Sequence, residues 1–243
     1  MLAAASLGNL LHCARHSSQK YVAIDSLRLP WTPITTGPAL YFAVPSTRTI
    51  REIEIKLSVV NLPALIGRLK RLGAIVRGRV LERNTLYDTP GSDLRRGGCL
   101  LRLRLETPAA SPPVRAGLPR AVLTFKAPLA SKRQNRYKEK LERELVIRHP
   151  GRLLRTLKEL DFRPGFRYEK YRTSWRLPGL HLDLDETPVG NFLELEGLPT
   201  AIERVADTLG YAHRDYLRTT YWELYAADCE RKGRVATNMM FDT

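Results

Sequence analysis

The sequence predicts an α+β fold in which about eight strands close into a β-barrel with a charged interior, covered on the outside by helices. From residue 50 onward, strand-like segments alternate aliphatic residues with charged ones. Between these strands, leucines recur at helical spacing. The 243 residues, 43% of them hydrophobic, are enough for one domain with a substantial core.

Eight segments have the composition and length of strands. Their boundaries are 50–57, 84–88, 99–106, 121–127, 138–147, 167–175, 180–185 and 191–197. The proline-rich stretch 107–119 between the third and fourth segments is predicted to be a mobile hairpin loop. The chain shows no internal repeat.

The alternation in these strands is unusual, because the residues between the aliphatic ones are charged rather than mixed polar. Several strands carry two like charges on one face. The charged positions are Glu52, Glu54, Lys56, Arg102, Arg104, Lys126, Glu142, Glu144, Lys170, Arg172, Asp183, Asp185, Glu194 and Glu196. Any one of these faces alone could simply meet water. Together they favour a closed sheet, since eight strands are enough to enclose a small ligand.

Three amphipathic helices are predicted to cover the outward aliphatic faces. Leucines and isoleucines line one side of the segments 61–72, 152–160 and 200–209, and Thr200 is expected to cap the last of these. A further helix is expected from residue 215 to about 229.

The chain is strongly basic, with a net charge of +15 and a pI of about 10.1. This charge favours an anionic partner: a nucleic acid, an anionic membrane surface or a phosphorylated small molecule. No apolar run is long enough to span a membrane. The three cysteines have no short spacing, which favours a reducing, cytoplasmic setting over a disulfide framework.

A barrel interior that carries both acids and bases is suited to a metal–polyphosphate complex. Clustered carboxylates are the ligands that Mg²⁺ and Mn²⁺ prefer. Arginine and lysine bind phosphate, arginine through paired hydrogen bonds and lysine as a point charge. Phosphoryl chemistry needs mainly positioning and charge neutralisation, which such a site supplies.

The motifs in this series resemble the CYTH superfamily, the triphosphate tunnel metalloenzymes. The first motif is Glu52-Ile53-Glu54-Ile55-Lys56, which is similar to the ExExK signature of that superfamily. The later motifs follow in the same order, over about residues 50–228: 87–89, 101–104, 123–126, the Glu142 and Glu144 pair, 169–172, 183–185 and 190–196. The layout is most similar to the class IV adenylate cyclase-like branch.

The resemblance implies an eight-stranded antiparallel tunnel that uses Mg²⁺ or Mn²⁺. It also implies roles for single residues. Glu52, Glu54 and Lys56 would be catalytic. The triphosphate would be held by Lys56, Arg102, Arg104, Lys126, Lys170 and Arg172. Metal would be bound or positioned by Glu52, Glu54, Asp183, Asp185, Glu194 and Glu196, with Glu142 and Glu144 holding a second metal or orienting cations.

Three functions remain open at this stage. A class IV adenylate cyclase would convert ATP into cyclic AMP and pyrophosphate, whereas a triphosphatase would hydrolyse tripolyphosphate, thiamine triphosphate or a nucleoside triphosphate. A non-catalytic module would only bind polyanions. We expect a small-molecule triphosphate as the partner and neither a nucleic acid nor a membrane; a homodimer is left open.

The predicted organisation has three parts. Residues 1–48 hold a single acid, Asp25, and form a poorly ordered extension, an organellar targeting segment or the product of an over-extended start site. Residues 49–228 form the CYTH domain, and 229–243 form a C-terminal tail.

Overall fold

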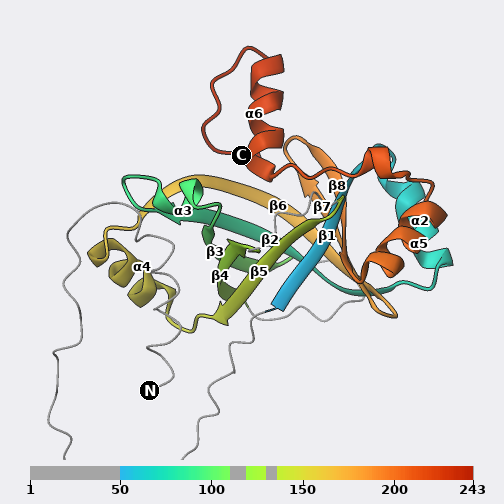
Figure 1. Ribbon diagram of the computed structural model, residues 1–243, viewed down its shortest axis with the longest axis horizontal. Helices are drawn as coiled ribbons and strands as arrows, with labels where there is room; N and C mark the ends of the chain where they lie inside the picture. The colour runs from blue at the N-terminus through green and yellow to red at the C-terminus, as the bar shows by residue number, and fades with distance from the viewer. Residues whose placement is uncertain (1–49, 110–118, 130–135, 243) are drawn as a thin grey trace, which may run out of the picture. The chain divides into compact units, whose positions relative to one another are not determined.

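The eight strands of the described chain form a closed antiparallel barrel in the order β1-β5-β4-β3-β2-β6-β7-β8 (Figure 1). The computed structural model describes residues 50–109, 119–129 and 136–242. The extension predicted for residues 1–48 and most of the predicted loop 107–119 lie outside these ranges. The strands are β1 (Ile50–Val59), β2 (Ile75–Asp88), β3 (Leu100–Pro108), β4 (Arg120–Pro128), β5 (Lys138–Val146), β6 (Arg163–Leu177), β7 (Leu180–Thr187) and β8 (Gly190–Gly197). The predicted barrel is therefore confirmed.

Two strands are much longer than the sequence predicts. β2 begins at Ile75, nine residues before the predicted start at residue 84, and β6 extends from Arg163 to Leu177. These two strands pair with each other over most of their length, with register shifts between Val76 and Gly78 and between Thr85 and Tyr87. The first half of β2 has no clean two-residue alternation, so its strand character depends on pairing with β6.

The helices lie close to their predicted positions, except that the last one begins at Tyr221 and not at residue 215. They are α2 (Leu62–Arg71), α4 (Pro150–Glu159), α5 (Pro199–Thr208) and α6 (Tyr221–Arg231), with two short helices that the sequence did not predict, α3 (Asp93–Arg96) and η1 (His213–Asp215). The predicted cap at Thr200 is wrong, because Leu198 occupies the N-cap position and makes no side-chain cap. Pro199 starts that helix instead, since its fixed φ suits the first turn.

The main hydrophobic core lies outside the barrel, between its outer surface and two helices. α2 and α5 lie together beside β1, β7 and β8, and α4 lies at the other side of the barrel (Figure 1). The core combines Ile55 and Leu57 of β1 with leucines of β7 and β8, and with Leu69 and Ile202 from the two helices. From α4 only Leu157 is buried. Because the outward faces hold the aliphatic residues, the inward faces are left to the charged ones.

The C-terminal segment packs against the barrel. α6 begins with a capping box, in which Thr220 and Glu223 satisfy each other's backbone N–H groups. After α6, Met239 lies fully buried, and its backbone bonds to Arg167 and Glu169 of β6. The ring of Phe241 lies 5.2 Å from that of Tyr171. None of the helices in the described ranges is long and apolar enough to cross a membrane.

Candidate functional site

The inward faces of the strands place most of the predicted charged residues inside the barrel. The buried ones are Glu52, Glu54, Lys56, Arg104, Lys170, Asp183 and Asp185. Cross-strand register brings the acids together: Glu54 lies opposite Glu196, and Glu194 lies opposite Asp183. The two-residue alternation of each strand therefore becomes a single charged lining once the sheet closes.

Arg172 lies among several carboxylates of this lining. Its guanidinium donates to Asp185 and Glu194 at 2.5 Å and lies 2.7 Å from Asp183. Burial opposes its charge, but Asp183, Asp185, Glu82 and Glu194 together outweigh burial and raise the pKa of Arg172. The planar fork of arginine suits simultaneous contacts with several carboxylates. Arg172 therefore ties β6 to β7 and β8.

Glu82 of β2 is a site residue that the sequence did not single out. It is 1% exposed, and its carboxylate lies 3.5 Å from Lys170 and 3.7 Å from both Arg104 and Arg172. Burial alone would raise its pKa, but Lys170, Arg172 and Arg104 together lower it to about 2. The segment Leu81–Asn84 does not alternate aliphatic with charged residues, so only the pairing with β6 reveals its role.

Lysines from β4 and β5 hold the two acids of the first motif. Lys126 donates to Glu52 at 2.6 Å and lies 3.5 Å from Glu142, while Lys138 donates to Glu54 at 2.7 Å. Lys138 was not predicted, although it is two residues from Lys140 and four from Glu142 and so shares their face.

The acids of this motif differ in their pKa values. Burial, with the nearby carboxylates of Glu54 and Glu142, raises the pKa of Glu52 to about 8. Burial also opposes the charge of Glu54, but Lys138 and Lys126 outweigh it and lower the pKa. One acid of the pair therefore keeps a proton near neutral pH while the other is ionised.

Arg102 and Arg104 of β3 have partners on both sides of the interior. Arg104 donates to Glu144 at 3.2 Å, and Arg102 donates to the hydroxyls of Tyr168 and Thr124 at 3.3 Å. Glu144 is 38% exposed, and its ion pairs are with these two arginines. Glu144 is thus grouped with cations rather than with the other predicted metal ligands, which fits a role in orienting cations.

Glu196 lies at the half-buried part of the lining. Burial, together with Glu142 and Glu54, raises its pKa despite nearby His181. His181 in turn lies 2.8 Å from Asp183, which also accepts a hydrogen bond from Ser174. Glu196 therefore belongs to the same group of carboxylates as Glu54 and Glu142.

Tyr221 brings α6 into the site, which the sequence did not predict because its alternation signal concerns strands only. Its hydroxyl donates to Asp185 at 2.6 Å, and the ammonium of Lys56 lies 3.9 Å from the centre of its ring. Lys56 also donates to the backbone oxygen of Thr219 at 3.0 Å and lies 3.5 Å from Glu194. The chain just before α6 is therefore bonded directly to the predicted catalytic lysine.

The donor chemistry of the lining fits a hard divalent cation. Carboxylate oxygens are the donors that such cations prefer. Four of these acids come from the neighbouring strands β1 and β8: Glu52, Glu54, Glu194 and Glu196. Within the described ranges no three acidic, histidine or cysteine side chains converge as a ready-made cluster, because lysines and arginines occupy the space between them. These carboxylates are the groups of the lining that could hold a divalent metal ion.

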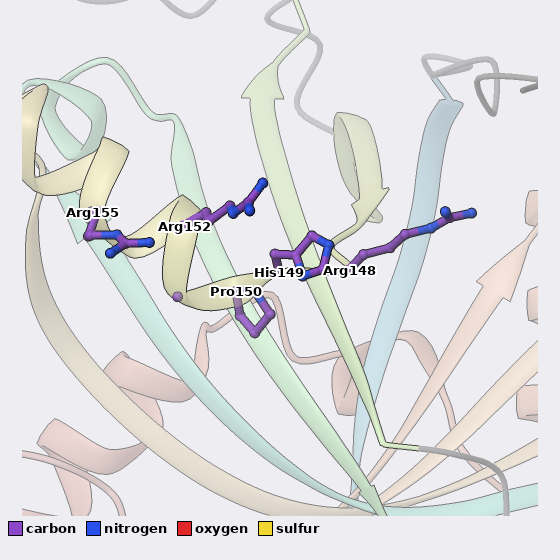
Figure 2. A pocket seen from close by; sticks show the side chains of 6 residues that line it. Arg148, His149, Pro150, Arg152 and Arg155 are labelled. Carbon is purple, nitrogen blue, oxygen red and sulfur yellow. The ribbon is translucent and has the colours of Figure 1, made fainter.

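A second basic feature lies outside the barrel, around the start of α4. Arg148, His149, Arg152 and Arg155 line an open hollow of about 520 Å³, together with Pro150 and Gly151 (Figure 2). No ion pair of these three arginines is found among the described residues. The hollow has no carboxylate in its lining, so it lacks the donors that the predicted metal site requires.

Comparison with known proteins identifies the family. The CYTH domain profile matches residues 51–220, which are more than half of the chain and include all of the barrel but the first residue of β1. The chain belongs to the CYTH domain family. This is a family of metal-dependent triphosphate-tunnel proteins, and the charged barrel interior corresponds to the tunnel. The resemblance recognised in the motifs is thereby confirmed.

Solved structures share the CYTH fold with this chain. The PH1819 protein of Pyrococcus horikoshii OT3 is 22% identical, with a TM-score of 0.57 over 73% of this chain and 99% of that one. A "putative adenylate cyclase" from Vibrio parahaemolyticus is also 22% identical, with a TM-score of 0.58 over 71% and 96% of the two chains. The PH1012 protein of Pyrococcus horikoshii OT3 is 24% identical, with a TM-score of 0.54 over 71% and 98%. A search of curated proteins found no match.

Proposed function

We propose that this CYTH protein is a divalent-metal-dependent enzyme that processes a triphosphate, in a reaction resembling that of class IV adenylate cyclases. The observation that carries the proposal is the meeting of opposing rows of acids and bases inside one closed barrel. Arg172, bonded to Asp183, Asp185 and Glu194, is the clearest instance. Such charges are costly to bury unless they are paired or hold a charged ligand.

The proposed division of labour follows the charges. Lys56, Arg102, Arg104, Lys126, Lys170 and Arg172 hold the triphosphate oxygens. Glu52, Glu54, Asp183, Asp185, Glu194 and Glu196 bind or position metal, and Glu142 and Glu144 orient the neighbouring cations. Lys138 and Glu82 join them as partners that keep Glu54 and the arginines in place.

In the cyclase reaction the ribose 3′-oxygen of ATP bonds to the α-phosphorus, the bond from that phosphorus to the bridging oxygen breaks, and pyrophosphate leaves. The hydroxyl proton passes to an ionised carboxylate of the lining or to a water molecule. A bound Mg²⁺ or Mn²⁺ would supply charge neutralisation for the phosphate oxygens. The lysines and arginines of the lining orient the triphosphate, and the buried position of the site excludes bulk water.

Product analysis tests this proposal. The protein is incubated with ATP, tripolyphosphate and thiamine triphosphate, each with Mg²⁺ or Mn²⁺, and the products are separated by chromatography. We expect cyclic AMP and pyrophosphate from ATP. Release of orthophosphate instead would make the protein a triphosphatase. Absence of turnover with every substrate and both metals would contradict an enzymatic function and favour polyanion binding.

Glu54→Gln provides the matched variant for this assay. It keeps the shape of the side chain but removes the charge, so metal-dependent turnover is expected to fall sharply. A simple polyanion binder would keep or gain affinity after the same change, since a negative charge is lost. Three further points stay predictions. They are the domain limits of 49–228, a cytoplasmic location and the assembly of two chains into a homodimer.

A further inference from the structure

We propose that the basic hollow around the start of α4 is a second anion-binding site, which takes a soluble compound with two or more linked phosphates and needs no metal ion. The hollow lies outside the barrel and is lined by Arg148, His149, Pro150, Gly151, Arg152 and Arg155 (Figure 2). The reaction proposed for the tunnel uses none of these residues. The site is therefore a further one, and its test does not depend on the proposed function.

The local fold turns the arginines of the hollow toward solvent. Leu157 is the buried side chain of α4. With 3.6 residues per turn, Arg152 and Arg155 lie on the opposite side of the helix from Leu157, and both are exposed. Arg148 comes two residues before the helix begins at Pro150, so its side chain joins theirs at the helix start.

The cationic groups of the hollow form a row. In Figure 2 the side chains of Arg155, Arg152, His149 and Arg148 follow one another along the start of the helix. Linked phosphates also present their negative oxygens in a row. Because arginine binds phosphate through paired hydrogen bonds, such a compound can bond to more than one of these side chains at once.

The three arginines of the hollow have no acidic partner in the described part of the chain. Within those ranges their side chains form neither an ion pair nor a hydrogen bond, and no carboxylate lines the hollow. An exposed arginine elsewhere can be paired, as Arg51 is with Glu139 at 2.6 Å. Guanidinium groups that hold no acid keep their donors for an anionic ligand.

The lining favours a small soluble compound over a nucleic acid or a membrane. The volume of about 520 Å³ lies within the range of about 300–1,000 Å³ that is typical of small-molecule sites. No tyrosine, tryptophan or phenylalanine lines the hollow, although single-stranded nucleic acids usually stack their bases on such rings. The uncharged lining residues are Pro150 and Gly151, which offer no bulky apolar side chain for insertion into lipid.

The absence of acids from the lining of the hollow distinguishes it from the tunnel. Cations of the tunnel lie beside carboxylates, as Arg172 does beside Asp185 at 2.5 Å, and these carboxylates are the candidate metal ligands. The lining of the hollow offers a divalent cation no carboxylate and repels it by its positive charge. Binding at the hollow is therefore expected to persist when EDTA removes divalent metals.

Calorimetric titration of tripolyphosphate into the full-length protein in EDTA tests the site. Arg152→Gln/Arg155→Gln removes two cations of the hollow, and the control pair Arg71→Gln/Arg204→Gln removes the same charge from exposed positions of α2 and α5. We expect the first pair to weaken binding at least about tenfold and the control pair to leave it within about twofold. Equal effects of the two pairs, or no binding by the wild-type protein in EDTA, would overturn the site.

Two larger probes test whether the phosphates belong to a macromolecule or a membrane instead. A single-stranded RNA oligonucleotide is followed by fluorescence anisotropy, and vesicles containing phosphatidylserine are followed by sedimentation. We expect Arg152→Gln/Arg155→Gln to bind both probes no more weakly than the control pair does. RNA or vesicle binding that is lost only in Arg152→Gln/Arg155→Gln, while tripolyphosphate binding is unchanged, would overturn the proposal and make the hollow a docking surface for that partner.

Discussion

Arg172 shows how much of the site depends on the shape of one side chain. Its guanidinium lies within 2.7 Å of three acids from two other strands, which a single ammonium could not match in the same geometry. Arg172→Lys keeps the charge and loses the fork. We expect KM for the triphosphate to rise at least about tenfold, measured by steady-state kinetics.

The control for this variant is Arg51→Lys. Arg51 also pairs with an acid, Glu139 at 2.6 Å, but its side chain is 61% exposed. Exposed pairs contribute little, so this change should leave KM unaltered. Equal effects from both substitutions would mean that the arginine fork has no special role in binding.

The ion pairs of Glu82 make part of the free energy of unfolding depend on pH. Its pKa of about 2 lies below the ordinary 4.5, so its contribution is fully present above pH 4.5 and is lost as the pH falls toward 2. Glu82→Gln should lower the free energy of unfolding by about 3 kcal/mol near neutral pH. Urea unfolding at several pH values should show this difference shrinking in acid, and a constant difference would contradict the assigned ion pairs.

From the raised pKa of Glu52, we expect metal binding to become stronger as the pH rises. Its pKa of about 8 means that the folded protein holds a proton there at neutral pH, which a metal must displace. The dissociation constant for Mn²⁺ should therefore fall as the pH rises toward 8 and then level off. Titration followed by manganese electron paramagnetic resonance measures it, and Glu52→Gln should bind more weakly with a flatter pH profile.

Glu54, Glu82 and Tyr221 show which residues of the site can be predicted from the sequence and which cannot. Glu54 could be predicted to line the interior because it belongs to an unbroken aliphatic–charged alternation. Glu82 stands between Leu81 and Arg83 without that alternation, and its position depends on the register with β6. Tyr221 lies on a helix, so no strand pattern could place it beside Asp185.

At the scale of elements, the strand centres were predictable and their ends were not. All eight predicted strands exist, because most of them have a strong local alternation. The extra length of β2 and β6 comes from their mutual pairing, which is a property of the fold. The short helix α3 was missed because four residues carry no helical period.

The packing of the C-terminal segment gives an element-scale prediction. Met239 is fully buried, whereas its neighbour Met240 is 41% exposed. Met239→Ala should destabilise the protein by about 2–3 kcal/mol because it leaves a cavity between α6 and β6. Met240→Ala is the matched control.

Thermal unfolding monitored by circular dichroism would check the pair of variants. Met240→Ala should change the stability by less than about 0.5 kcal/mol, as expected for an exposed site. If the two substitutions had the same effect, the segment after α6 would not be packed as described.

For the whole molecule, the positions of the charges say more about the class of partner than the net charge does. The barrel interior pairs its cations with acids, whereas the arginines around α4 face solvent. The net charge of +15 alone left nucleic acid, membrane and phosphorylated small molecules as partners. Closure of the sheet favours the last of these, because it gathers both signs of charge in one enclosed space.

The most direct test of this account is a crystal structure of the protein with tripolyphosphate and Mn²⁺, in which anomalous scattering locates the metal. We expect manganese inside the barrel, bound by carboxylates of β1 and β8 such as Glu54 and Glu194, with the phosphates held by Arg104, Lys126 and Arg172. Manganese and phosphate bound only on the outer surface, for example at the arginines around α4, would contradict it.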